Sequence, residues 1–212
     1  MPDAPTPLAN LRALTQPADL QGWGVRLEPL SPAHLAGLQA AAADGQLWQL
    51  RVTWVPHPEE TSAYIQLALD MQAQGTRCPF AVLDAASGRV LGTSSYHDIV
   101  PAVQRLEIGY TWYAASAQRS HVNTAAKLLL MRHAFDTLGC AVVGWRTDLL
   151  NTRSQQAIER LGARKDGVLR HHAQRRDGSV RDTVMYSMLA SEWPAAQQAL
   201  LEKMKHRVPD LA

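Results

Sequence analysis

The 212-residue chain has only two cysteines, Cys78 and Cys140, which lie far apart. Zinc sites and disulfide frameworks need cysteines in closely spaced sets, so we expect neither and interpret both thiols as small buried apolar groups. Charge of one sign is also scarce. The 21 Lys and Arg residues against 19 Asp and Glu residues leave a formal net charge of +2, too small to make a nucleic acid the expected partner.

Long apolar runs are missing as well. A run such as residues 128–131 is far short of the roughly 20 apolar residues that span a bilayer. The N-terminus has neither the basic nor the apolar segment of a signal peptide. We therefore expect no membrane partner and a cytoplasmic location. What remains is an ordinary globular composition, 46% hydrophobic and 19% charged, with enough length to bury one core.

Apolar periodicity and turn residues predict a mixed α/β (α+β) sheet with helices on both faces. We expect an N-terminal arm over residues 1–22, a single domain over 23–190 and a C-terminal helix over 191–212 packed on that domain. The predicted strands cover residues 25–29, 79–83, 89–96, 105–113 and 140–148 and a hairpin over 163–189, and the predicted helices cover 31–43, 58–75, 123–138 and 151–161.

The passage from the strand over 105–113 to the helix after it holds the sequence Gln118-Arg119-Ser120-His121-Val122-Asn123-Thr124. The start of a helix presents free backbone N–H groups and the positive end of the helix dipole, and both suit a phosphate or pyrophosphate. Every strand-to-helix turn has these donors, so a purely structural turn is the alternative.

Three ordered segments carry a family resemblance. They are Glu107-Ile108-Gly109-Tyr110, then Gln118–Thr124 at the position of a Q/R-x-x-G-x-G/A motif, then Asn151-Thr152-Arg153-Ser154 leading to Glu159–Ala163. Together they resemble the GNAT acetyltransferase superfamily, and within it the RimJ/RimL type of N-acetyltransferase, over residues 25–189. The resemblance implies a seven-stranded mixed sheet whose fourth and fifth strands splay apart at a bulge near Gly109.

The resemblance also implies acetyl-CoA as co-substrate and no metal. The pantetheine arm would lie between the splayed strands and pair with the backbone of Trp112 and Tyr113. The remaining cofactor contacts would come from Gln118, Arg119, Ser120, His121, Val122, Asn123 and Thr124, with Asn151 and Arg153 from the following helix.

A metal site is not expected from the histidines. The adjacent residues His171 and His172 lie in a predicted strand and point to its opposite faces, which does not suit a metal site.

Acetyl transfer to an amine needs a base, a stabilised oxyanion and a proton for the departing thiolate. Glu107 is the candidate base, acting directly or through water, and partial burial would raise its pKa. The alternative is a strand glutamate paired with a neighbouring basic residue.

Many relatives use a Tyr to protonate the thiolate where this chain has Ile158, so we assign Ser154 as the acid and Asn151 as the residue that orients the cofactor arm. Both also suit the start of a helix as capping residues.

His121 stands where the family motif has Gly. Either the turn follows a right-handed path that tolerates a side chain, or cofactor binding is weakened.

We expect an enzyme that transfers acetyl from acetyl-CoA to a primary amine, either a protein N-terminus or a small molecule, as a monomer or homodimer. The alternatives are a non-catalytic acyl-CoA-binding or regulatory module and a longer acyl donor such as succinyl-CoA. The basic hairpin over 163–181 is a weak reason to consider the longer donor. The shape of the loops over 44–60 and 96–104 would determine which acceptor binds.

Overall fold

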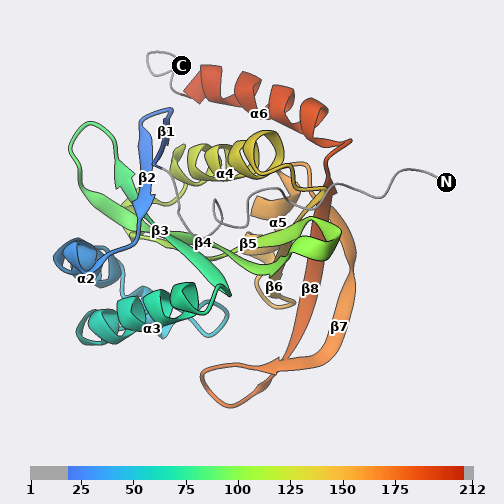
Figure 1. The fold of residues 1–212 in the computed structure, drawn as a ribbon. Coiled ribbons are helices and arrows are strands. Elements are labelled where there is room, and N and C mark those ends of the chain that lie inside the picture. The colour runs from blue at the N-terminus through green and yellow to red at the C-terminus, as the bar shows by residue number, and fades with distance from the viewer. Residues whose placement is uncertain (1–18, 208–212) are drawn as a thin grey trace.

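The structure is a computed structural model that describes residues 19–207 (Figure 1). It confirms a mixed α/β fold, but the sheet has eight strands where seven were expected. The extra strand is β1, in the segment predicted to be an arm, and its three residues are too few for an alternating pattern to reveal. In spatial order the strands are β1 (Leu20–Gly22), β2 (Val25–Pro29), β3 (Arg77–Asp84), β4 (Val90–Val100), β5 (Arg105–Tyr113), β6 (Val142–Asp148), β8 (Val180–Leu189) and β7 (Arg164–Gln174).

The turn between β1 and β2 explains the extra strand. Trp23 and Gly24 have φ angles of 51° and 73°, and two positive φ angles in a two-residue loop are typical of a tight hairpin turn. The turn pairs Gly22 with Val25 and Leu20 with Leu27. The chain therefore enters the sheet before the first predicted strand.

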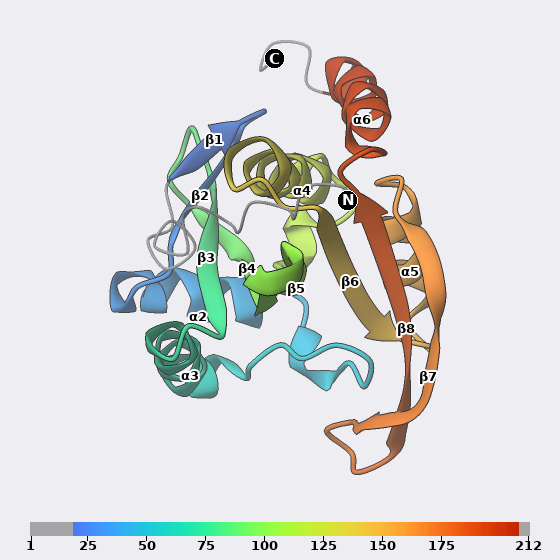
Figure 2. The same cartoon turned by 45° about the vertical axis from the view of Figure 1, so that its right-hand side comes forward.

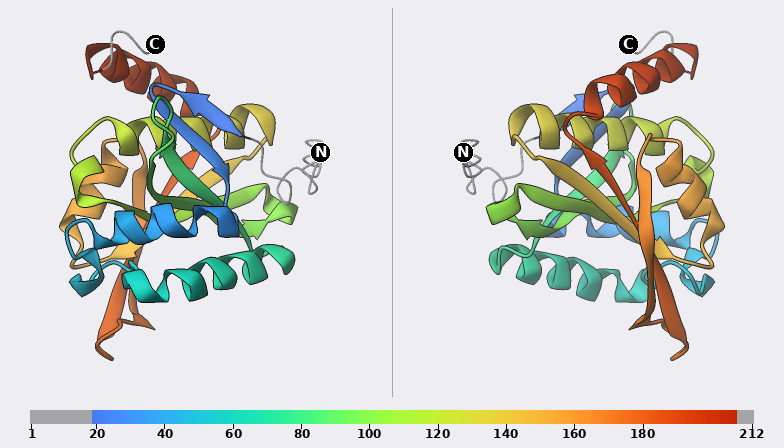
Figure 3. Two further views of the ribbon diagram at one scale, coloured as in Figure 1. Left: turned by 90° about the vertical axis from the view of Figure 1, so that its left-hand side faces the viewer. Right: turned by 90° about the vertical axis from the view of Figure 1, so that its right-hand side faces the viewer.

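Helices cover both faces of the sheet, as predicted. Helices α2 (Leu35–Ala43) and α3 (Thr61–Ala73) lie on one face, and α4 (Val122–Arg132) lies on the other (Figures 2 and 3). Beyond α4 the chain continues through a π-helical turn over His133–Thr137. Two further helices, α5 (Thr152–Glu159) and α6 (Trp193–Arg207), follow β6 and β8.

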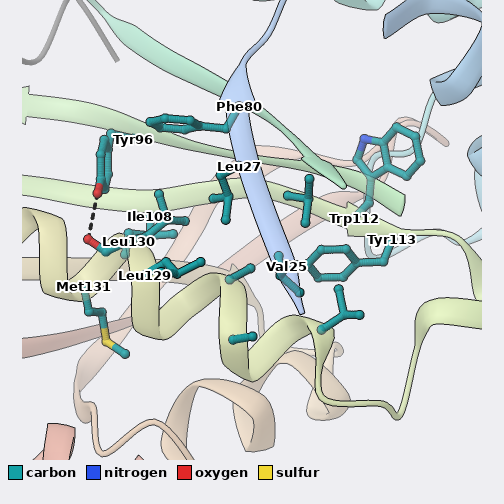
Figure 4. Close-up of a cluster of buried hydrophobic side chains, with 14 of the residues drawn as sticks. Val25, Leu27, Phe80, Tyr96, Ile108, Trp112, Tyr113, Leu129, Leu130 and Met131 are labelled. Atoms are coloured by element: carbon teal, nitrogen blue, oxygen red, sulfur yellow. Dashed lines mark hydrogen bonds between the residues drawn. The ribbon is translucent and has the colours of Figure 1, made fainter. Parts of the chain in front are cut away.

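The core between the sheet and α4 fixes where that helix begins. Phe80 and Tyr96 of neighbouring strands pack edge to face, and the Tyr96 hydroxyl donates a hydrogen bond of 2.7 Å to the Leu130 carbonyl in α4 (Figure 4). Leu27 of β2 and Ile108 of β5 are buried in the same layer. Because several strands hold the helix, its first turn has a defined position relative to β5.

The predicted splay lies between β5 and β6. These parallel strands pair only from Arg105–Glu107 to Val142–Gly144 and then diverge, while β4 stays paired with β5 and β8 stays paired with β6. Figure 2 shows the two ribbons separating. Beyond Glu107, the edge of β5 that faces β6 therefore has no strand partner in the described chain.

The bulge expected near Gly109 lies one residue further on. Gly109 pairs with Ser95 and Trp112 with Thr93, so Tyr110 and Thr111 together oppose one residue of β4. Tyr110 has a φ of 51°, a backbone conformation that side chains rarely adopt. Gly109 has a different reason to be glycine, because a Cβ there would lie 2.3 Å from Nε2 of His97.

A glycine substitution tests the close approach of β4 and β5 next to the bulge. A Cβ on Gly92 would lie 2.0 Å from the Trp112 carbonyl oxygen, which is backbone and cannot rotate away. We expect Gly92→Ala to lower the free energy of unfolding by about 3 kcal/mol or more, measured by urea denaturation. Gly167→Ala in β7 is the control, because nothing lies within 4 Å of its added carbon and it should change stability by less than about 0.5 kcal/mol. Equal midpoints for the two variants would contradict this packing.

Candidate active site

The turn before α4 keeps a helical backbone at His121. Its φ and ψ are −72° and −21°, so of the two alternatives for this position the right-handed path is the one observed. The left-handed conformation falls on Arg119 instead, with a φ of 60°. Ser120 holds the turn, since its hydroxyl donates to the Ala117 carbonyl at 2.6 Å and accepts from the Val122 N–H at 3.2 Å. A glycine is therefore not required at residue 121.

The first turn of α4 has features that suit an anion. Val122, Asn123 and Thr124 form this turn, and the first N–H groups of a helix have no partner within the helix. Together with the helix dipole they favour a phosphate group at this end. The residues present therefore fit the diphosphate of a CoA molecule, with the unpaired edge of β5 beside them.

Gln118 connects three of the elements that were predicted to hold the cofactor. Its side-chain nitrogen donates to the Tyr113 carbonyl at 3.0 Å, and its oxygen accepts from Arg153 of α5 at 3.0 Å. The structure thus brings Gln118, Arg153 and the end of β5 together. Trp112 and Tyr113 point to opposite faces, and the Trp112 ring lies 6.2 Å from that of Tyr64 in α3.

Asn151 and Ser154 meet at the start of α5. The Asn151 side-chain oxygen accepts from the Ser154 N–H at 3.0 Å, which is the capping role weighed for Asn151 from the sequence. Its side-chain nitrogen donates to the Val52 carbonyl at 3.3 Å and so holds the loop over 44–60 beside α5. Their parts in acyl transfer remain predictions.

Glu107 is fully buried and lies between two arginines. Its Oε1 is 2.6 Å from Nη2 of Arg105, and its Oε2 is 2.5 Å from Nε of Arg146, which also pairs with Asp98 at 2.6 Å. The pairing with basic neighbours that was weighed as an alternative is therefore present. Burial raises the pKa of Glu107 and outweighs the opposing effect of Arg146 and Arg105.

His97 is a candidate that the sequence did not reveal. Cross-strand pairing puts Arg77, His97, Glu107 and Gly144 in one row across β3, β4, β5 and β6. The Nε2 atom of His97 lies 3.9 Å from Oε2 of Glu107, and its side chain is 12% exposed. Burial, helped by the charge of Arg146, lowers the pKa of His97 to about 4, so the imidazole is neutral and a weak base near pH 7.

The arginines at the tip of the β7–β8 hairpin are engaged within the protein. Arg175 makes a two-point contact with Asp148, at 2.6 and 2.9 Å. Arg176 donates to the Val55 carbonyl at 2.8 Å, and Asp177 pairs with Arg51 at 2.7 Å. This tip therefore holds the loop over 44–60 and contributes less to anion attraction than its composition suggests.

Neither a cluster of metal-ligating side chains nor a membrane-spanning helix is present among residues 19–207. No group of three or more His, Cys, Asp or Glu side chains there could hold a metal ion. None of the helices in the same range is both long and apolar enough to cross a membrane.

Lys127 of α4 is a second group that sequence reasoning missed. It is 5% exposed, and its ammonium group donates to Thr111 of the bulge at 2.6 Å and to Ser94 of β4 at 3.1 Å. Both partners are neutral hydroxyls. Burial lowers the pKa of Lys127 to about 7. The lysine therefore holds the bulge from the α4 face, and no carboxylate of the described residues pairs with it.

This shifted pKa predicts a pH dependence of stability. Between pH 7 and 10.5 the unfolded chain binds a proton at Lys127 that the folded chain releases, so stability rises with pH and falls as the solution is acidified towards 7. We expect Lys127→Met to remove up to about 1.4 kcal/mol per pH unit of this slope, measured by urea denaturation from pH 7 to 8.5. Parallel curves for both proteins would contradict the lowered pKa.

Known proteins share this architecture. A GCN5-related N-acetyltransferase from Brucella melitensis superimposes with a TM-score of 0.80 at 33% sequence identity, over 88% of this chain and 85% of that one. The structure of RimJ from Mycobacterium smegmatis in complex with CoA-disulfide has a TM-score of 0.72 at 21% identity, over 90% and 94% of the two chains, which shows the shared fold alone.

Sequence comparison gives the same family. YdaF of Bacillus subtilis (strain 168), provisionally named a ribosomal N-acetyltransferase, is 32% identical over 112 residues, which are 50% of this chain and 57% of that protein. The match therefore spans little more than half of that relative. The model of the acetyltransferase (GNAT) domain family matches residues 25–164, from β2 to the start of β7. The chain thus belongs to the GNAT acetyltransferase family and is an acyltransferase.

Proposed function

We propose that this protein is an N-acetyltransferase of the RimJ/RimL type, which transfers acetyl from acetyl-CoA to a primary amine at a protein N-terminus or on a small molecule. The observation that carries this proposal is the divergence of β5 and β6 after three residue pairs, directly beside the start of α4. The RimJ complex with CoA-disulfide and the provisional name of YdaF are consistent with it.

Acetyl-CoA would occupy two adjoining features. The amides of the pantetheine arm would pair with the free edge of β5 near Trp112 and Tyr113, as an added strand does. The diphosphate would lie on the first turn of α4, where Arg119 adds a positive charge. The thioester would then lie near the bulge at Tyr110.

The reaction would be a direct attack. The amine nitrogen forms a bond to the thioester carbonyl carbon, and the C–S bond breaks when the tetrahedral intermediate collapses. The amine proton passes to Glu107 through water, because the carboxylate itself is enclosed, and the neutral His97 imidazole lies beside this route. Ser154 gives a proton to the CoA thiolate, and Asn151 orients the cofactor arm.

One observation favours the second candidate, a non-catalytic acyl-CoA-binding or regulatory module. Both oxygens of Glu107 are already bound by arginines, so its carboxylate is held as a structural ion pair would be. The right-handed conformation at His121 argues against one further reason for this alternative, the loss of the motif glycine, whereas Ile158 in place of a Tyr remains a reason for it. Turnover in the wild-type protein decides between the two.

The first experiment replaces the proposed base. Glu107→Gln should lower kcat for acetyl transfer to an amine about 10²- to 10⁴-fold, while binding of acetyl-CoA by calorimetry is retained. Glu159→Gln of α5 is the matched control and should leave kcat unchanged. Because Glu107→Gln leaves two arginines without their carboxylate, the thermal unfolding of both variants is measured alongside. A wild-type protein that binds acetyl-CoA but acetylates no amine in a broad panel would favour the regulatory module.

The second experiment separates the acid from the helix cap. Ser154→Ala keeps the backbone N–H that Asn151 binds, so we expect stability within about 0.5 kcal/mol of wild type but a kcat roughly 10²-fold lower. Asn151→Ala should cost about 1 kcal/mol of stability through loss of the cap. If Ser154→Ala retains full kcat, another group protonates the thiolate.

A further inference from the structure

Arg77, the first residue of β3, is a buried cation without a counter-ion. It is 2% exposed, and among the described residues no carboxylate pairs with it. Its Nε donates to Ser95 at 2.9 Å and its Nη2 to the Tyr64 hydroxyl at 3.1 Å, but its Nη1 has no hydrogen-bond partner within the described chain. A buried charge that lacks a partner is costly, so this guanidinium has an unmet requirement for an anion.

The position of Arg77 connects it to the proposed reaction. Its guanidinium lies 3.9 Å from the ring centre of Tyr110, the bulge residue, and 5.5 Å from that of Tyr64. It shares a cross-strand row with His97 and Glu107. The unpaired Nη1 therefore lies on the face of the sheet that carries the candidate base.

We propose that Arg77 forms a carboxylate subsite, so that the substrate pair of this enzyme includes a carboxylate close to the reacting carbonyl. This inference rests on the proposed function and narrows it. A guanidinium N–H and a carboxylate form a strong charge-assisted hydrogen bond. The rings of Tyr64 and Tyr110 lie against the guanidinium, and those of Trp54 and Trp112 pack edge to face on Tyr64. These aromatic surroundings suit a ligand with an apolar body.

Access to Nη1 requires a side chain to move, because the atom is enclosed. Two exposed rings next to the site can do so. Tyr110 is 36% exposed and covers one face of the guanidinium, and Trp54 is 50% exposed. Tyr110 also holds the unfavourable backbone φ of 51°, and such conformations cluster at ligand clamps.

The carboxylate has two sources that share this chemistry. It belongs either to a dicarboxylic acyl group, such as succinyl on CoA, or to an acceptor that carries both an amine and a carboxylate. Two matched pairs of probes separate them. Succinyl-CoA is compared with acetyl-CoA at one amine, and tryptophan is compared with tryptamine at one acyl donor.

For the wild-type protein, we expect kcat/KM to be about 10- to 100-fold higher for the carboxylate-bearing member of one of these pairs. Arg77→Met should abolish that preference while leaving kcat/KM for the uncharged member within a few-fold. Arg77→Lys, which keeps the charge, should retain part of the preference. Arg89→Met in the β3–β4 turn, an exposed site, is the control and should leave both values unchanged.

Stability gives an independent readout. Since Arg77 has no counter-ion, Arg77→Met should not lower the unfolding temperature, and the carboxylate-bearing ligand should raise it more in wild type than in the variant. Equal kcat/KM within both pairs in the wild-type protein, or an unchanged preference in Arg77→Met, would overturn the subsite while acetyl transfer stands. Failure of any acyl-CoA to bind would overturn the proposed function and this inference together.

Discussion

The brevity of the pairing between β5 and β6 is the constraint on which the site depends. The two parallel strands share three residue pairs and then part, while each keeps its partner on the other side. A strand edge with unpaired backbone groups needs another source of hydrogen bonds, and an amide-bearing molecule can supply them. The bulge at Tyr110 bends β5 close to the point where its pairing with β6 ends. The gap between the two strands and the distortion of β5 therefore lie at the same place in the sheet.

Positive charge gathers around that bulge from both faces of the sheet. Lys127 approaches it from the α4 side with only hydroxyl partners, and Arg77 approaches from the α3 side with one nitrogen unpaired. Neither is balanced by a carboxylate in the described chain, although Glu107 nearby is held by two arginines. Such burial costs stability, and on the α3 side it leaves a guanidinium nitrogen that the proposed substrate carboxylate would pair with.

The surrounding elements hold this arrangement in place through a few long-range contacts. The bond from Tyr96 to the Leu130 carbonyl fixes α4 against the sheet, and Gln118 joins β5, the turn and α5. Asn151 and Arg176 bind carbonyl groups of the loop over 44–60, which we expect to select the acceptor. The walls of the site therefore come from segments more than 90 residues apart in the chain.

The sequence by itself determined the order of most strands and helices, the turn over 118–124, the cap at Asn151 and Glu107 as a strand carboxylate, since each depends on residues close together in the chain. Only the tertiary structure decided that Arg77 and His97 lie in a row with Glu107, that Lys127 reaches the bulge and that the hairpin arginines bind the chain's own carbonyls and Asp148. The reason is physical: cross-strand register and burial arise when distant segments pack, and burial sets the pKa of each group and its need for a partner.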